Sequence, residues 1–265
     1  MWKIALLVVA LPYLWCYIYT GGTLAYHYYY CRKKHPDGNP PAARLLAVFL
    51  VESNHFALFM AMRLFRPLRR RVRAFNRSEA GSPVVFCHGY TMDASGFCFL
   101  RRRLRLSRPV YGITLPKVFA PIDELSKYLA EDLTRIMAAH PAGRIALVAH
   151  SMGGLVARSA LRDPALAARV GVLVTLGSPH NGTPLARIAP GRNARDMVPG
   201  SPFLNRLNEA SLPCRVVSLY TRADNLVFPY TASILEGARN IEMPLMGHMG
   251  LLLDGTVAGH VKSEV

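Results

Sequence analysis

Short apolar runs alternate with amphipathic segments from residue 81 onward, and this pattern constrains the fold more than any other feature of the chain. The runs expected to form strands are residues 84–87, 110–114, 145–149, 170–176, 215–220 and 240–243. The clearest helical segments between them are residues 122–139 and 152–161. The alternation predicts an α/β fold with a mostly parallel sheet and helices on both faces. Reactive groups in such a sheet gather at the carboxyl ends of the strands.

The composition excludes a disordered chain and indicates the charge of its partners. Hydrophobic residues make up 51% of the 265 residues and charged residues 18%, which is enough apolar material for a core. The net charge of +16 favours an anionic partner, either nucleic acid or an anionic membrane surface. Residues 1–80 are more basic per residue than the remainder.

The chain shows no motif for a metal or a redox cofactor. Its five cysteines are scattered and include no Cys-x-x-Cys pair, so we expect free thiols rather than disulfides or a zinc site. The sequence contains no His-Glu-x-x-His motif and no Gly-x-Gly-x-x-Gly loop after a strand. We therefore expect neither a metal nor a cofactor.

The first thirty residues predict a membrane anchor. No Asp, Glu, Lys or Arg lies between Lys3 and His27, residues 4–19 are almost wholly apolar, and tyrosines crowd the far end. This length is about what the hydrocarbon core requires, with aromatic rings at the interface. A cleavable signal peptide is the alternative, because Gly21 and Gly22 would permit cleavage. The long apolar run and its tyrosine-rich end favour an uncleaved anchor with a single span.

A basic segment and a second apolar stretch follow the anchor. Arg32, Lys33 and Lys34 place the bulk of the chain on the cytoplasmic side by the positive-inside rule. Residues 45–65 carry Glu52 to His55 at their middle, which favours an amphipathic helix in the membrane interface. A second membrane span at residues 45–65 is the alternative, and it would place the bulk of the chain on the opposite side of the membrane. The arginines that follow this stretch are expected to contact anionic lipid, with a solvated linker as the alternative: Arg63, Arg66, Arg69, Arg70, Arg71, Arg73 and Arg77.

Two domains are therefore expected. Residues 1–80 would form the transmembrane anchor and the basic amphipathic segment, and residues 81–265 would form the α/β domain. A chain that lacks residues 1–80 is expected to be soluble.

Residues 145–158 predict a strand, a tight turn and a helix, with Ser151 at the turn. A Gly-x-Ser-x-Gly elbow holds a serine on a strained turn that exposes its hydroxyl, and it needs small flanking residues because strand and helix nearly touch. Gly153 fills the second small position, and Ala149 replaces the first glycine with one extra methyl group. A helix N-cap is the alternative role for Ser151. The strand before it and the helix after it favour a nucleophile.

The segment from Ala149 to Gly154 resembles the α/β-hydrolase superfamily, specifically its bacterial lipase and esterase branch, and the resemblance extends over about residues 83 to 260. The family implies catalytic residues in the order serine, acid, histidine. Asp224 follows the strand at 215–220 in a segment similar to the family's acid loop, with an Asx-turn as the alternative. His248 lies between glycines after the last expected strand and resembles the family's base loop.

The resemblance also implies an oxyanion hole and substrate contacts. The backbone amides of Met152 and Tyr90 would stabilise the oxyanion. Gly89 would let the backbone approach the substrate, and His88 would order the loop beside it. We place both in the substrate-binding region.

Residues 177–183 resemble the Gly-Ser-Pro-His-x-Gly-Thr loop of lipase-like esterases. His180 in this loop would contribute to a wall of the acyl pocket, with a structural histidine as the alternative. Residues 183–212 hold one expected short helix at 203–207. A small lid over residues 190–207, or the membrane itself, would therefore have to shelter the acyl chain.

The resemblance implies a serine hydrolase that cleaves carboxylic esters, of lipids or other acyl groups, through an acyl-enzyme. An acyltransferase or a thioesterase would use the same triad. A basic membrane scaffold without catalysis is the alternative of a different class. Nucleic-acid binding is disfavoured, because the aromatic residues of the N-terminal segment lie in an apolar run and not among its arginines. The expected partners are an ester or lipid substrate and an anionic membrane surface.

Overall fold

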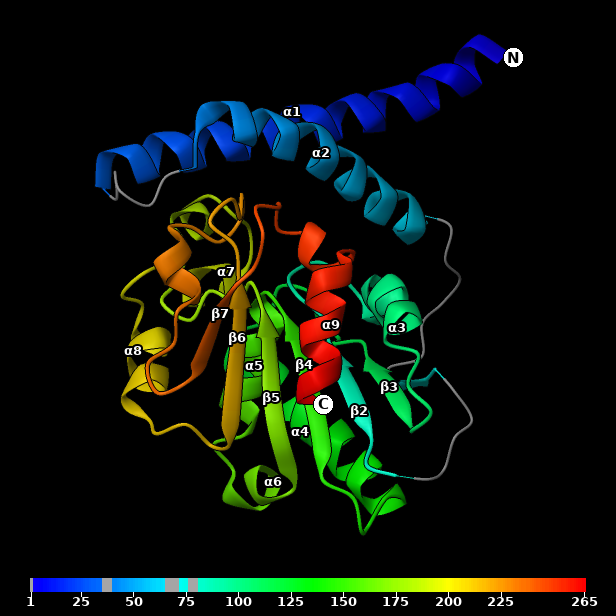
Figure 1. Ribbon diagram of the computed structural model, residues 1–265, viewed down its shortest axis with the longest axis vertical. Helices are drawn as coiled ribbons and strands as arrows, with labels where there is room; N and C mark the ends of the chain where they lie inside the picture. Colours follow the sequence, from blue (N-terminus) through cyan, green and yellow to red (C-terminus); the bar gives the residue numbers. More distant parts are fainter. Residues whose placement is uncertain (1, 35–39, 65–71, 76–80) are drawn as a thin grey trace.

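The computed structural model describes residues 2–34, 40–64, 72–75 and 81–265. In this part of the chain, seven strands form one sheet in the order β1-β3-β2-β4-β5-β6-β7 (Figure 1). The strands are β1 (Val72–Ala74), β2 (Val84–Cys87), β3 (Val110–Ile113), β4 (Ile145–His150), β5 (Val170–Leu176), β6 (Arg215–Tyr220) and β7 (Arg239–Glu242). β1 pairs with β3 in the antiparallel direction, and all other neighbours are parallel.

The expected α/β fold with a mostly parallel sheet is confirmed. All six expected strands are present, and their ends differ from the expected ones by one residue at most. β1 was not predicted from the sequence. It is three residues long, lies at the sheet edge and follows an arginine-rich segment, so it carries too little hydrophobic alternation to be recognised.

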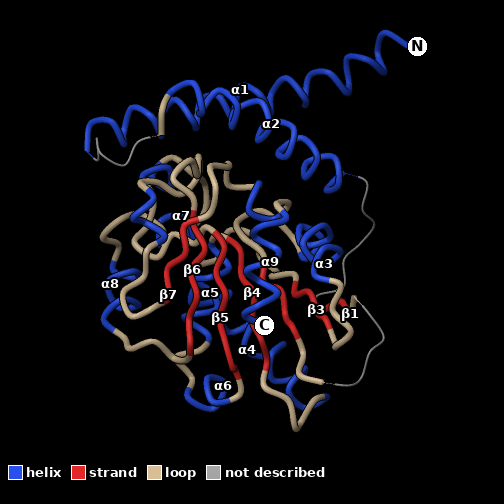
Figure 2. The backbone as a smooth tube through the Cα atoms, in the orientation of Figure 1, coloured by secondary structure: helices blue, strands red, loops and turns tan. Residues whose placement is uncertain are grey.

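Helices cover both faces of the sheet (Figure 2). They are α3 (Cys98–Leu104), α4 (Ile122–Ala139), α5 (Met152–Ala160), α6 (Pro164–Ala168), α7 (Arg192–Asp196), α8 (Pro202–Glu209) and α9 (Gly255–Glu264). Side chains of one strand point alternately to the two faces. Thus Leu147 of β4 joins the core under α4 and α5, whereas Val148 joins the core under α3 and α9.

Two further helices, α1 (Trp2–Lys34) and α2 (Ala42–Leu64), pack against each other as an antiparallel hairpin. The Tyr17 hydroxyl of α1 accepts a hydrogen bond from the Asn54 amide of α2 at 2.9 Å, and Leu24 packs with Leu45. The hairpin lies across the edge of the sheet where the parallel strands end (Figure 1). It therefore covers the edge at which reactive groups gather in this kind of sheet.

One helix among the described residues is long and apolar enough to cross a membrane, at Ala42–Met62 within α2. This is the second apolar stretch, for which the sequence favoured an interfacial helix, and not the segment of α1 predicted to be the anchor. This helix is a candidate membrane span by its length and its apolar composition only. The arginines expected to contact lipid at positions 66, 69, 70, 71 and 77 lie outside the described residues.

Candidate active site

Ser151 occupies a strained turn between β4 and α5. Its φ of 56° and ψ of −131° lie in a region that residues other than glycine rarely adopt. Two backbone hydrogen bonds hold the turn: the Ser151 amide donates to the Leu176 carbonyl at 2.8 Å, and the Gly154 amide donates to the Ser151 carbonyl at 3.0 Å. The local geometry is that of the strand–turn–helix elbow that the sequence pattern predicts.

The two glycines after Ser151 are required by close packing. A Cβ atom on Gly153 would lie 2.6 Å from the carbonyl oxygens of Cys87 and His88, and one on Gly154 would lie 2.2 Å from Ser178 Oγ. Such distances are too short for any side chain, so the start of α5 can approach β2 and β5 only because these positions are glycine. Ala149, in contrast, is buried within β4, where its methyl group joins the core.

Asp224 and His248 form a buried hydrogen-bonded pair. Asp224 lies in the loop after β6, and its Oδ2 is 2.8 Å from Nδ1 of His248. Its Oδ1 also accepts the backbone amides of Leu226 at 2.9 Å and Val227 at 2.8 Å. One carboxylate thus closes its own loop, as in an Asx-turn, and orients the imidazole. With Nδ1–H donated to Asp224, Nε2 of His248 is left as the basic nitrogen.

The surroundings of His248 favour its charged form. Burial lowers the pKa of His248, but the charge and the hydrogen bond of Asp224 and the charge of Glu52 raise it, and the net pKa lies above the ordinary value of 6.5. The neighbouring His150 shows the opposite behaviour, since burial and the charge of His248 hold its pKa well below 6.5. His150 therefore stays neutral, and its Nε2–H donates to the His248 carbonyl at 3.3 Å.

Ser151 and His248 line the same cavity, which has a volume of about 640 Å³. One wall comes from the loop after β5 and includes Leu185, Ile188 and Pro190. The hairpin supplies the facing wall, through Trp15, Tyr19, Phe56, Phe59 and Met60. The segment at 190–207, where a small lid was expected, contains α7 and most of α8, and only Pro190 and Met197 of this segment line the cavity. Shelter for an apolar group therefore comes largely from the hairpin.

The loop after β2 lies against Ser151. A Cβ on Gly89 would lie 2.7 Å from Ser151 Cβ, so this position must be glycine for the backbone to come so close. His88 is buried, where it accepts the Leu115 amide at Nε2 and places Nδ1 near the Gly89 carbonyl, both at 2.8 Å. It ties the loop to the chain after β3, in agreement with an ordering role. Tyr90 lines the cavity, and its hydroxyl donates to the Pro190 carbonyl.

His180 does not line this cavity. It is fully buried, with Nε2 3.1 Å from Thr175 Oγ1 and Nδ1 3.4 Å from an Arg158 nitrogen. Burial and the charge of Arg158 hold the pKa of His180 well below its ordinary value. These contacts favour the structural alternative over a wall of the acyl pocket.

Three residues at the site were not singled out as site residues from the sequence. Gly177, with a φ of +56°, would place a Cβ 2.9 Å from Asp224 Oδ2 and 3.3 Å from His248 Nδ1. His150 holds the His248 carbonyl, and Glu52 of α2 accepts hydrogen bonds from the loop after His248. Two of them could have been found from the sequence. Gly177 is a glycine directly after an expected buried strand, and Glu52 is a carboxylate in the middle of a largely apolar stretch.

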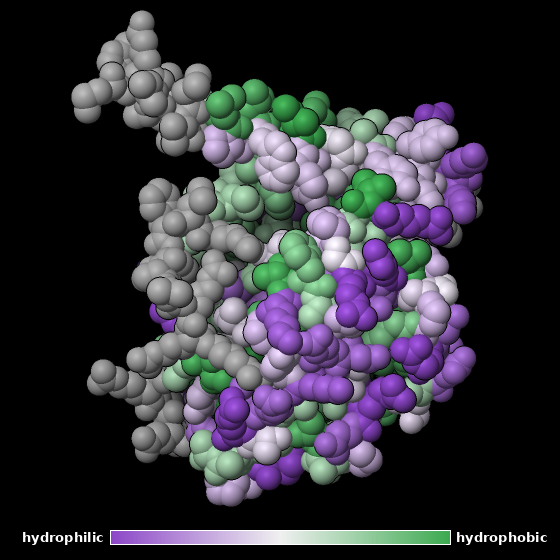
Figure 3. All heavy atoms as spheres, turned by 180° about the vertical axis from the view of Figure 1, so that it is seen from behind, coloured by the Kyte–Doolittle hydropathy of each residue, from purple (hydrophilic) through white to green (hydrophobic). Residues whose placement is uncertain are grey.

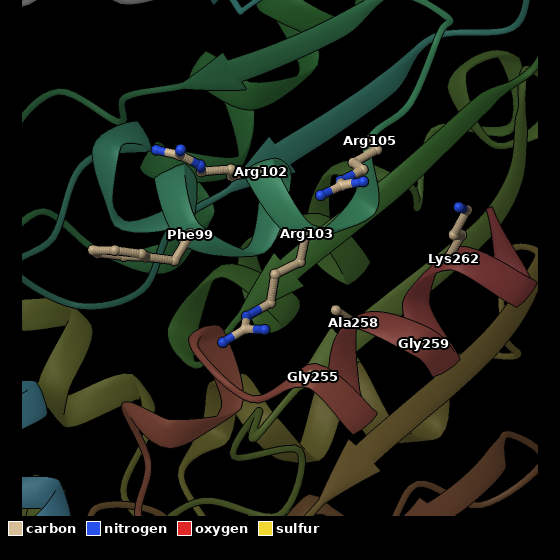
Figure 4. Close-up of a pocket in the computed structure, with 8 residues that line it drawn as sticks. All are labelled: Phe99, Arg102, Arg103, Arg105, Gly255, Ala258, Gly259 and Lys262. Carbon is tan, nitrogen blue, oxygen red and sulfur yellow. The ribbon is translucent and has the colours of Figure 1, made fainter.

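A second cavity, of about 730 Å³, lies between α3 and α9 (Figure 4). Its charged lining consists of Arg102, Arg103, Arg105 and Lys262. Its lining contains no Ser, Cys, His, Asp or Glu side chain. Among the described residues, no group of three or more His, Cys, Asp or Glu side chains could hold a metal ion.

The fold is that of the α/β-hydrolases. The chain is similar to a mature lipase of Bacillus licheniformis, with a TM-score of 0.63 and 18% identity over 72% of this chain and 95% of that one. It is also similar to lipase B of Aspergillus fumigatus, with a TM-score of 0.61 and 17% identity over 69% of this chain and 52% of that one. For an esterase of Thermogutta terrifontis the TM-score is 0.53, with 17% identity over 72% of this chain and 91% of that one.

Residues 119–191, which include α4, β4 and α5, match the model of the PGAP1-like alpha/beta domain family. The chain thus has the α/β-hydrolase fold, and its architecture is similar to that of bacterial lipases and esterases. No curated protein sequence matches the chain significantly.

Proposed function

We propose that the protein is a serine hydrolase that cleaves carboxylic esters. The observation that supports this most strongly is the buried Asp224–His248 pair, with its 2.8 Å contact, facing the same cavity as a serine held at positive φ. A nucleophile, a base and a group that orients the base are the minimum for acyl transfer through serine.

In the proposed mechanism, Ser151 Oγ attacks the ester carbonyl carbon while His248 Nε2 accepts the hydroxyl proton. Asp224 keeps the imidazole oriented and stabilises its charged form. The negative charge that develops on the carbonyl oxygen is stabilised by the amides of Met152, at the start of α5, and Tyr90. Collapse of the intermediate breaks the bond to the alcohol, which takes the proton from His248. Water then repeats the sequence and releases the acid.

The substrate is proposed to be an acyl ester of a lipid. The cavity walls are mainly apolar, and the aromatic side chains that the hairpin contributes, such as Phe56 and Phe59, would contact a hydrocarbon chain. The structural neighbours bear the names lipase and esterase, which agrees with this class of substrate.

A fluorophosphonate probe with a panel of p-nitrophenyl esters tests this proposal. We expect covalent labelling at Ser151, and kcat/KM that increases from acetate toward medium-length acyl chains because each further methylene buries apolar surface worth about 0.8 kcal/mol. Inactivation by the probe should proceed in parallel with labelling. Labelling at another residue, or none at all, would contradict the proposal.

We propose that the hairpin attaches the enzyme to a membrane, with residues 81–265 as the catalytic domain. Most large hydrophobic side chains that stay exposed among the described residues belong to α1 and α2, for example Leu14, Ile18, Leu46 and Leu50. Figure 3 shows hydrophobic side chains along the top of the molecule, where the hairpin lies. The inner side of α2 is occupied by contacts with the catalytic loops, which fits a helix that lies in the interface. The cytoplasmic side of the membrane, inferred from the basic residues near position 33, stays a prediction.

Replacing Leu46 and Leu50 together by aspartate tests the attachment. We expect binding to vesicles with anionic lipid to weaken by at least about tenfold, since each buried leucine contributes about 1.5–3 kcal/mol. Hydrolysis of a soluble short-chain ester should change little. Co-sedimentation measures the binding, and Val118→Asp, at an exposed hydrophobic residue outside the hairpin, is the matched control. Equal binding of the double variant and the wild type would rule out this face.

A further inference from the structure

Glu52 is a buried carboxylate in the middle of α2, a largely apolar helix. Its side chain is 2% exposed, and it faces the loop that carries His248. Oε1 accepts the backbone amide of Met249 at 2.5 Å, and Oε2 accepts that of Gly250 at 3.1 Å. These amides belong to the two residues directly after the proposed base, so the N-terminal hairpin contacts the catalytic machinery itself.

The His248 loop fits closely around the Glu52 side chain. A Cβ atom on Gly247 would lie between 2.3 and 2.6 Å from Glu52 Cδ, Cγ and Oε2. The loop therefore contacts the glutamate on both sides of His248, through the glycine before it and the two amides after it. On its own helix, Glu52 has one further neighbour, His55, whose Nδ1 lies 3.4 Å from Oε2.

Burying a carboxylate at this position lowers the stability of the fold unless its charge is compensated. Removing a charge from water costs free energy unless hydrogen bonds replace its hydration, and apolar helices rarely carry one without a function. Here the compensating donors are backbone amides of a loop that a nonpolar side chain could not bind. The arrangement fixes a loop whose position decides where the imidazole lies.

Resting on the proposed function, we propose that Glu52 is a positioning residue for the catalytic base, so that the hairpin is a working part of the active site as well as a membrane attachment. Its carboxylate holds residues 247–250 in the conformation that directs His248 toward the cavity. A displacement of about 1 Å of a catalytic group can cost roughly a hundredfold in rate.

Among the residues that the structure describes, Asp224 and His150 contact His248, from the loop after β6 and from β4, and Glu52 of α2 acts on it electrostatically. His27 of α1 interacts electrostatically with Asp224, and His55 lies beside Glu52. The negative charge of Glu52 favours the imidazolium form. Neutralising Glu52 therefore lowers the pKa of His248, and the acid limb of the pH–rate profile moves to lower pH.

The test compares Glu52→Gln and Glu52→Ala with the wild type, in the full-length protein in detergent micelles. We expect kcat for a short-chain ester and the rate of fluorophosphonate labelling to fall about tenfold to a hundredfold, with KM changing less. The acid limb of kcat/KM should shift to lower pH, which a purely structural role would not cause. Asn54→Ala is the matched control, because its amide bonds Tyr17 in α1 and not the His248 loop.

A second variant keeps the test decisive if the Glu52 variants fold poorly. Gly247→Ala leaves the carboxylate intact but pushes the loop away from it, and we expect a similar loss of kcat with a cooperative thermal transition. Wild-type kcat and an unshifted acid limb in Glu52→Gln would overturn the proposal, as would an equal loss in Asn54→Ala. If the wild type itself fails to react with the probe, the proposed function is refuted and the role of Glu52 with it.

Discussion

Replacing Ser151 by alanine is expected to lower kcat for ester hydrolysis at least roughly 10⁴-fold, because the cavity then contains no activated hydroxyl. The loss of a single oxygen leaves the elbow in place, since its two backbone hydrogen bonds do not involve the side chain. The melting temperature should therefore stay near that of the wild type. Initial rates with a chromogenic ester and a thermal melt measure both quantities.

Ser159→Ala is a suitable control for this variant. Ser159 lies in the same helix, α5, but its hydroxyl donates to Asp123 on the outer side of the domain. It should retain the activity of the wild type. Hydrolysis by the Ser151 variant at close to the wild-type rate would eliminate Ser151 as the nucleophile.

Asp224→Asn is expected to lower kcat by a factor of about 10⁴ while the fold is retained. An asparagine amide in place of Oδ2 would face Nδ1–H of His248 with a donor, so the imidazole would turn or change tautomer. The amide oxygen can still accept the backbone amides of Leu226 and Val227 that close the loop. Steady-state kinetics and circular dichroism separate the two effects.

The pH dependence of the same variant provides an independent check. In the wild type, His248 must be neutral to act as a base, so kcat/KM rises with pH through its pKa, which lies above 6.5. Without the charge of Asp224 that pKa falls, and the remaining activity should reach half of its plateau at lower pH. An acid limb at the same pH in both proteins would show that Asp224 does not act on His248.

The sequence was informative wherever a property is local. The strand before Ser151, the small residue at Gly153 and the helix at residues 122–139 depend on neighbours a few residues away, and each is found in the structure. The pairing of Asp224 with His248 is not local, but the order of residues in the resembled family was enough to select both. Their roles in catalysis await the experiments above.

The arrangement of the hairpin could not be predicted in the same way. An apolar helix has the same composition whether it contacts lipid or protein, and Glu52 acquires its partners only through loops almost two hundred residues further along the chain. From the sequence alone, residues 1–80 are predicted to form a domain that is separable from residues 81–265. The contacts of Glu52 with Met249 and Gly250 argue against such a separation.

This long-range contact has a consequence for biosynthesis. Met249 lies 197 residues after Glu52, so the hairpin is synthesised well before the loop that Glu52 binds. Under the proposed mechanism, Ser151 cannot be activated before the loop that carries His248 has emerged and docked on the hairpin. The proposed activity would therefore be acquired only after that loop has been synthesised.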